Sequence, residues 1–226
     1  MGKHRDTWAL THSFVCIVFG MLFLFGKTEA NSSWLVVGLV GYGFVMFCIL
    51  LVGQHHGVMH LQNIVTLIRL AAGGGFLCWM LARPEFTLHK FCFISAAALT
   101  DVVDGIIARR KGSTDFGAKL DMEVDAFFTL LLSVNGFVFA QMGAWILLVG
   151  LMRYGYEFIL LLLPEVEKFP DFVKYGEKTI CAYTVIALIS ITAPFFPYTG
   201  KLLLGYGALA LLGFSFLMNM CARVLT

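Results

Sequence analysis

The stretch from residue 101 to residue 125, DVVDGIIARRKGSTDFGAKLDMEVD, concentrates negative charge in a chain that is otherwise strongly apolar. Long runs of Leu, Phe, Val and Ala lie on both sides of it. Carboxylates are costly to place among such residues, so their spacing in this stretch needs a physical reason. The stretch holds six acidic residues: Asp101, Asp104, Asp115, Asp121, Glu123 and Asp125.

Four of these aspartates form two pairs with helical spacing. Asp101 and Asp104 are three residues apart, so on a helix they share one face. Asp121 and Asp125 are four apart and share a face of the next helix. The turn around Ser113 is short, so we expect the two helices to be antiparallel neighbours. Counted from Ser113, the outer aspartates both lie twelve residues away and the inner ones nine and eight away. At about 1.5 Å per residue, the four carboxylates are expected at two matched depths, about 12 to 18 Å from the turn.

Such a box of carboxylates predicts a divalent-cation site, because four anions in an apolar setting need compensating charge. Oxygen ligands favour hard ions such as Mg²⁺, Mn²⁺ or Ca²⁺, and the stretch contains no His or Cys that would indicate zinc. Mg²⁺ commonly completes its coordination with water and substrate phosphate. The sequence therefore predicts a phosphorylated substrate.

Two other interpretations of the aspartates remain open. In one, the aspartates form intramembrane salt bridges with Arg109, Arg110 or Lys119. In the other, they mark the cation pathway of a transporter. Glu123 is a separate case, since it points about 160° to 200° away from the neighbouring aspartates and is expected to contact another helix or a second subunit.

The composition places this stretch in a membrane protein. The chain has 226 residues, of which 59% are hydrophobic and 13% charged, and its mean hydropathy is +0.85. A soluble domain carries about 25% charged residues. The net charge is +2 and the basic residues are dispersed, which argues against a nucleic-acid-binding surface. We expect an all-α integral membrane protein.

Eight apolar runs are long enough to cross the hydrocarbon core of a bilayer. Nine Lys and Arg residues fall at one set of ends and four at the other, which predicts cytoplasmic termini and a cytoplasmic loop at 110–116. The polar stretch at 163–178 is expected to be a surface loop or an interfacial helix on the same side. The predicted spans are residues 8–26, 33–53, 63–82, 89–109, 117–139, 143–163, 178–196 and 202–222.

The chain divides into two parts by where its polar residues lie. The first two spans, within residues 1–60, form an N-terminal addition. Residues 61–226 form a six-helix catalytic core, since the residues that are polar enough for chemistry occur there.

The aspartate stretch resembles the signature of the CDP-alcohol phosphotransferase (CDP-alcohol phosphatidyltransferase) family, D-x2-D-G-x2-A-R-x8-G-x3-D-x3-D. One departure is that seven residues, rather than eight, separate Arg109 from Gly117. Upstream, NIVTLIRL is similar to the N-x-x-T-x-x-R-L that opens the first core helix of the family, with Asn63, Thr66 and Arg69 at its fixed positions. The signature positions are filled by Asp101, Asp104, Gly105, Ala108, Arg109, Gly117, Asp121 and Asp125.

The resemblance implies a homodimeric membrane enzyme of phospholipid biosynthesis whose active site faces the cytoplasm. Such enzymes release CMP when an alcohol acceptor attacks a CDP-linked donor. The implied metal ligands, for one or two Mg²⁺ or Mn²⁺ ions, are Asp101, Asp104, Asp121 and Asp125. Asp125 is also implied to be the catalytic general base. The implied nucleotide-binding residues are Asp101, Gly105, Ala108, Arg109 and Gly117.

The sequence leaves the acceptor open. Arg153, Lys174 and Lys178 are candidates to bind a phosphorylated acceptor, although Arg153 also has helical spacing for an ion pair with Glu157 and the lysines suit interfacial anchors. We favour transfer of a phosphatidyl group from CDP-diacylglycerol to a small polar alcohol. The alternative is transfer of a head group from a CDP-alcohol to a lipid alcohol. A membrane prenyltransferase is disfavoured because all four aspartates lie within 25 residues.

Overall fold

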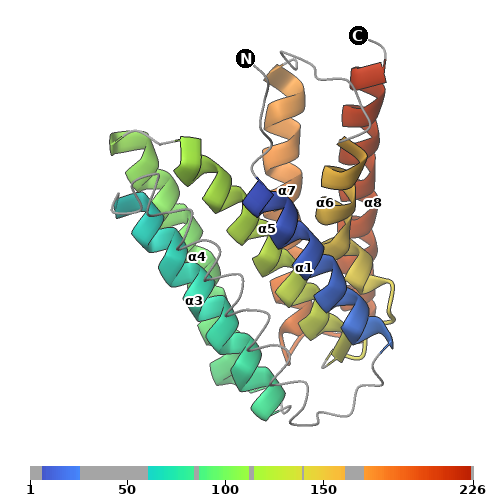
Figure 1. Ribbon diagram of the computed structural model, residues 1–226. Coiled ribbons are helices and arrows are strands. Elements are labelled where there is room, and N and C mark those ends of the chain that lie inside the picture. Colours follow the sequence, from blue (N-terminus) through green and yellow to red (C-terminus); the bar gives the residue numbers. More distant parts are fainter. Residues whose placement is uncertain are drawn as a thin grey trace.

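The computed structural model describes residues 7–25, 61–83, 87–111, 115–138, 140–160 and 171–224. These residues form a helical bundle without strands (Figure 1). Seven of the eight predicted helices lie within them, whereas the predicted span 33–53 lies outside the described residues. The helices are α1 (Thr7–Phe25), α3 (Leu61–Ala82), α4 (Leu88–Lys111), α5 (Asp115–Val138), α6 (Ile146–Leu160), α7 (Asp171–Thr192) and α8 (Tyr198–Val224).

The helix starts of α7 and α8 follow prolines. Residues 171–178, predicted as loop or interfacial helix, are the first two turns of α7. These residues are too polar to belong to a predicted apolar span. Pro170 directly before Asp171 nevertheless suits a helix start. In α8, the Lys201 amide donates to the Pro197 carbonyl at 3.1 Å and closes the first turn.

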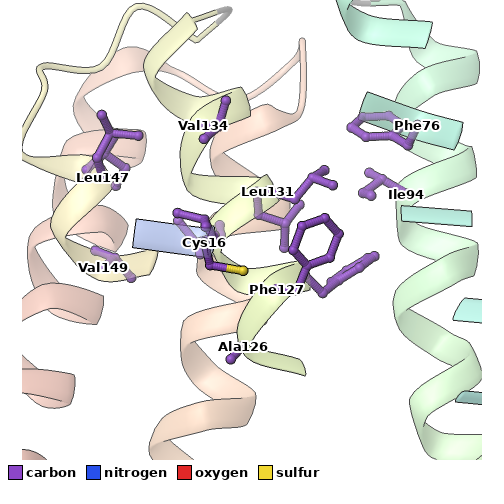
Figure 2. Close-up of a cluster of buried hydrophobic side chains, with 14 of the residues drawn as sticks. Cys16, Phe76, Ile94, Ala126, Phe127, Leu131, Val134, Leu147 and Val149 are labelled. Atoms are coloured by element: carbon purple, nitrogen blue, oxygen red, sulfur yellow. The ribbon is translucent and has the colours of Figure 1, made fainter. Parts of the chain in front are cut away.

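Helix α5 is the centre of the described bundle. It packs against α1, α3, α6 and α7, while α4 packs against α3 (Figure 1). Figure 2 shows Phe127 and Leu131 of α5 between Phe76 and Ile94 on one side and Val149 on the other. Most side chains of the second half of α5 are buried, as expected for a helix surrounded by others.

Small residues set the close approach of α5 and α6. A Cβ atom added to Gly150 of α6 would lie 2.6 Å from the Leu130 Cα of α5, closer than two carbon atoms can approach. In a membrane, helices associate through such close packing rather than through hydrophobic burial. Gly150 therefore fixes α6 directly against the helix that carries Asp121 and Asp125.

The surface of the described bundle is apolar. On α8, Leu203, Phe214 and Leu217 are 71%, 60% and 60% exposed, whereas the polar Arg69 and Glu123 are buried. Large apolar side chains outside and charged ones inside are typical of a protein surrounded by lipid.

Among the described residues, Tyr198–Cys221 is the one segment long and apolar enough to cross a bilayer. Only 22% of its most apolar window is buried, so it differs from the core helix of a soluble protein. Shorter apolar segments occur in α3, α4 and α6. The count of eight transmembrane helices is therefore not confirmed, and several crossings stay a prediction.

Helices α3 to α8 alternate in direction, so the end of α4 and the starts of α5 and α7 lie at the same end of the bundle (Figure 1). The sequence predicted that basic residues at these ends share one side of the membrane. The arrangement of the backbone brings the ends together, while their orientation toward the cytoplasm stays a prediction.

Candidate functional site

The site is built on the first half of α5, where Asp121 and Asp125 lie one turn apart on the same face. Their side chains are 41% and 49% exposed, so both carboxylates are open to a ligand from outside the bundle. Gly117, one turn earlier on this face, is buried. The spacing of the second aspartate pair is therefore realised as the sequence predicted.

Arg69 of α3 joins the two carboxylates. Its Nη2 atom donates to Asp121 Oδ1 at 2.6 Å and lies 2.8 Å from Asp125 Oδ1. Arg69 is 1% exposed, so its charge reaches the site from inside the bundle. An ionised hydrogen bond of this length is among the stronger polar interactions in proteins, and it fixes the direction of both side chains.

Arg69 belongs to the motif that opens α3. Asn63, Thr66 and Arg69 follow one another at intervals of three residues, and all three are buried, at 1%, 3% and 1% exposure. Helical residues three apart share a face. The motif therefore lies on the side of α3 that packs into the bundle, and its last member reaches the aspartates of α5.

Asp121 and Asp125 have an ion-pair partner that the sequence interpretation did not consider, while pairing with Arg109, Arg110 or Lys119 stays a prediction. Arg109, Arg110 and Lys119 lie close in the chain, but their side chains are outside the described residues. The described partner is Arg69, 52 residues before Asp121. One signal for it was present, because a lone arginine in an apolar helix must find an opposite charge.

The first aspartate pair lies on α4, whose backbone is helical through Lys111. The side chains of Asp101 and Asp104 are outside the described residues, as are those of Ala108 and Arg109, and so is the surrounding of Gly105. Helices α4 and α5 run in opposite directions and α3 contacts both (Figure 1). The meeting of all four carboxylates stays a prediction.

The described donor atoms fit part of a divalent-cation site. Asp121 and Asp125 supply the hard oxygen ligands that Mg²⁺ and Mn²⁺ prefer. Arg69 offsets one of the two negative charges of Asp121 and Asp125, so these three side chains together carry a net charge of about −1. The described side chains contain no group of three or more His, Cys, Asp or Glu residues suited to a metal. The side chains of Asp101 and Asp104 are not among the described ones.

Glu123 lies on the reverse face of α5. It is 3% exposed, and its Oε2 atom is 2.9 Å from Nδ1 of His12 in α1. The expectation that Glu123 contacts a neighbouring helix is confirmed. The identity of the partner was missed, since no motif connects His12 with a residue 111 positions later.

Arg153 of α6 lies near this reverse face. Its Nη2 atom is 4.0 Å from Glu123 Oε1, and its side chain is 25% exposed. Binding of an acceptor by Arg153 stays a prediction, as does the alternative ion pair with Glu157.

The two lysines predicted to bind an acceptor lie on α7. Lys178 is exposed, and the side chain of Lys174 is outside the described residues. The described structure therefore brings Arg69, Asp121 and Asp125 together, and leaves the lysines as candidates only.

Comparison with known proteins supplies the context for this geometry. A family model described as CDP-alcohol phosphatidyltransferase matches residues 59–218, which include α3 to α7 and most of α8. The resemblance seen in the aspartate signature is thereby confirmed. No curated protein and no solved structure matches the chain.

Proposed function

Because the chain belongs to the CDP-alcohol phosphatidyltransferase family, we propose that it transfers a phosphatidyl group from CDP-diacylglycerol to a small polar alcohol and releases CMP. The family is embedded in membranes and transfers phosphate-linked groups from CDP-alcohols in phospholipid synthesis. The donor, the acceptor and the dependence on metal are parts of the proposal. The observation that supports the metal site and the general base is the half-exposed pair Asp121 and Asp125, held by Arg69.

In the proposed reaction, a hydroxyl oxygen of the acceptor attacks the phosphorus of the phosphatidyl group. A new P–O bond forms to the acceptor, and the P–O bond to CMP breaks with its electron pair. The proton of the hydroxyl passes to Asp125, whose carboxylate is 49% exposed and can return the proton to solvent. Asp121 and Arg69 keep Asp125 in place during the attack.

The acidic residues also provide the proposed site for Mg²⁺ or Mn²⁺, with Asp101, Asp104, Asp121 and Asp125 as ligands. Bound there, the cation would polarise the diphosphate and neutralise charge on the departing CMP. Most of the remaining acceleration would come from positioning, as in other phosphoryl transfers. Gly105, Ala108, Arg109 and Gly117 are proposed to shape the cytidine side of the site; these follow from the signature and not from described contacts.

The cellular setting is a further part of the proposal. Nine Lys and Arg residues at one set of helix ends, against four at the other, favour an active site at the cytoplasmic face of a multi-pass protein. A homodimer is proposed from the family resemblance alone.

The test uses purified protein in lipid nanodiscs with CDP-diacylglycerol, Mg²⁺ and a panel of alcohols, including phosphorylated ones. CMP and the lipid product are measured together. We expect CMP release that depends on one of the alcohols and stops with EDTA. CMP release from a CDP-alcohol in the presence of diacylglycerol would instead show that the protein transfers a head group to a lipid alcohol.

The matched variants are Asp125→Asn and Asp115→Asn. Asp125→Asn is expected to lower turnover by about 10²-fold or more, because it removes the proton acceptor. Asp115→Asn changes an aspartate at the start of the same helix and is expected to keep activity near that of the unmodified protein. Ordinary turnover by Asp125→Asn would refute the assignment of the base. Cation flux without any nucleotide effect would favour the transporter.

A further inference from the structure

Helix α1 lies outside the residues that match the family, yet it packs directly on the helix that carries the aspartates. The family match begins at residue 59, whereas α1 ends at Phe25. In Figure 1, α1 crosses over α5 and α6, and it contacts both. The chain therefore adds a helix to the reverse side of its own candidate site.

A polar contact fixes α1 in this position. His12 is 4% exposed, and its Nδ1 atom lies 2.9 Å from Oε2 of the 3% exposed Glu123. The ring also packs edge-on against Tyr154 of α6, with 6.0 Å between ring centroids. A carboxylate buried to this degree is strongly unfavourable without a partner. Separating α1 from α5 would leave Glu123 without its closest described partner.

Glu123 and the aspartates lie on opposite faces of the same turn of α5. Glu123 is two residues from both Asp121 and Asp125, which is a rotation of about 200° in either direction. Arg69 of α3 holds the aspartate face, and His12 of α1 holds the Glu123 face. The two contacts together oppose rotation of α5 about its own axis.

The same cluster contains a thiol, since Cys16 Sγ lies 3.4 Å from His12 Nε2. A thiol, an imidazole and a carboxylate in this order are the components of a nucleophilic site. Cys16 is only 1% exposed, however, and no substrate can reach it in the packed bundle. The geometry is therefore suited to positioning and not to covalent catalysis.

We propose that His12 is a positioning residue: by holding Glu123, it docks α1 on α5 and fixes the rotation at which Asp121 and Asp125 meet Arg69 and their ligand. This inference rests on the proposed function for its kinetic consequence. Its structural part, the coupling of His12 to the aspartate face, does not require that function.

The experiment compares His12→Leu, Glu123→Leu and the double variant in the full chain. Phe14→Leu is the control, because Phe14 lies on the outer face of α1 and is 61% exposed. Three quantities are measured on the folded fraction: the apparent Tm, the dissociation constant for Mn²⁺, and kcat with KM for CMP release.

We expect the single variants to weaken Mn²⁺ binding and to lower kcat by about tenfold, because small misplacements of reacting groups are costly. The double variant should be no worse than the worse single variant, since neither partner is left buried alone. Glu123→Gln, which keeps an acceptor for the His12 ring N–H, should retain most of the activity. The control should match the unmodified protein in all three quantities.

Several results would overturn the inference. They are additive effects of the two single variants, unchanged Mn²⁺ binding and kcat in folded single variants, or equal losses in Glu123→Gln and Glu123→Leu. Unmodified protein that binds Mn²⁺ but releases no CMP would refute the proposed function alone, and the Mn²⁺ and Tm data would still decide the role of His12. Unmodified protein that binds no Mn²⁺ would refute the metal-dependent function and the role of His12 in positioning a metal ligand, and the Tm values of the single and double variants would still decide the coupling of His12 to Glu123.

Discussion

Replacing Arg69 with methionine tests how the charges of the site are balanced. Arg69 Nη2 lies 2.6 Å from Asp121 Oδ1 and 2.8 Å from Asp125 Oδ1, so these two oxygens are no further apart than the sum of the distances, about 5.4 Å. Two unit charges at that separation repel by about 3 kcal/mol at an effective dielectric constant of about 20, and by about 0.8 kcal/mol in bulk water.

The carboxylates are about half exposed, so solvent screens their repulsion and the expected loss lies at about 1 to 3 kcal/mol. For a chain of this size, that loss corresponds to a fall in apparent Tm of about 2 to 12 °C. Methionine keeps much of the apolar stem of arginine, which limits the loss of packing. The main change is therefore the missing positive charge.

The assay is thermal unfolding in detergent, with EDTA and then with Mg²⁺. In EDTA, Arg69→Met is expected to unfold at a lower temperature than the unmodified protein. Added Mg²⁺ should raise the Tm of Arg69→Met by more than that of the unmodified protein, because the cation replaces the missing charge and stabilises the folded form that binds it. Arg69→Lys should lose less, since both contacts use the single nitrogen Nη2 and an ammonium group can serve both carboxylates.

The matched control is Arg83→Met, since Arg83 is exposed and follows the end of α3. It should change neither the Tm in EDTA nor the response to Mg²⁺. The reasoning is refuted if Arg69→Met unfolds like the unmodified protein in EDTA. It is also refuted if the response to Mg²⁺ persists after Asp121→Asn and Asp125→Asn are added to Arg69→Met.

Two further predictions concern the helical frame. Gly150→Val should lower the free energy of unfolding by about 1 to 3 kcal/mol, seen as a lower Tm, because the new Cβ would meet the Leu130 backbone at 2.6 Å. Gly155→Ala should be neutral, because a Cβ atom at Gly155 would have nothing within 4 Å. Equal effects of the two variants would contradict the packing of α6 on α5. A nitroxide label at Phe214, which is 60% exposed, should collide more often with oxygen than with a water-soluble nickel reagent, as expected for a lipid-facing position; the reverse ratio would place this face of α8 in water.

The apolar runs predicted the described helices well, because each described run is long enough for a transmembrane helix and forms a helix. The runs failed at the start of α7, where Asp171 and the polar residues after it continue the helix outside the apolar segment. The spacing of Asp121 and Asp125 and the rotation of Glu123 were predictable, since they follow from the geometry of one helix.

The partners of these residues were not predictable in the same way. The sequence placed Arg69 in a motif but did not connect it with Asp121. The partners considered for Asp121 were basic residues close to it in the chain. His12 carried no signal at all. Both contacts join helices distant in sequence, and their choice depends on how α1, α3 and α5 pack.

The most direct measurement is a titration of Mn²⁺, followed by electron paramagnetic resonance, with and without CDP. The account predicts that the purified protein binds Mn²⁺, that CDP tightens this binding, and that Asp121→Asn with Asp125→Asn abolishes both effects. Mn²⁺ binding that ignores CDP, or that survives the loss of both aspartates, would contradict a metal site that holds a nucleotide diphosphate.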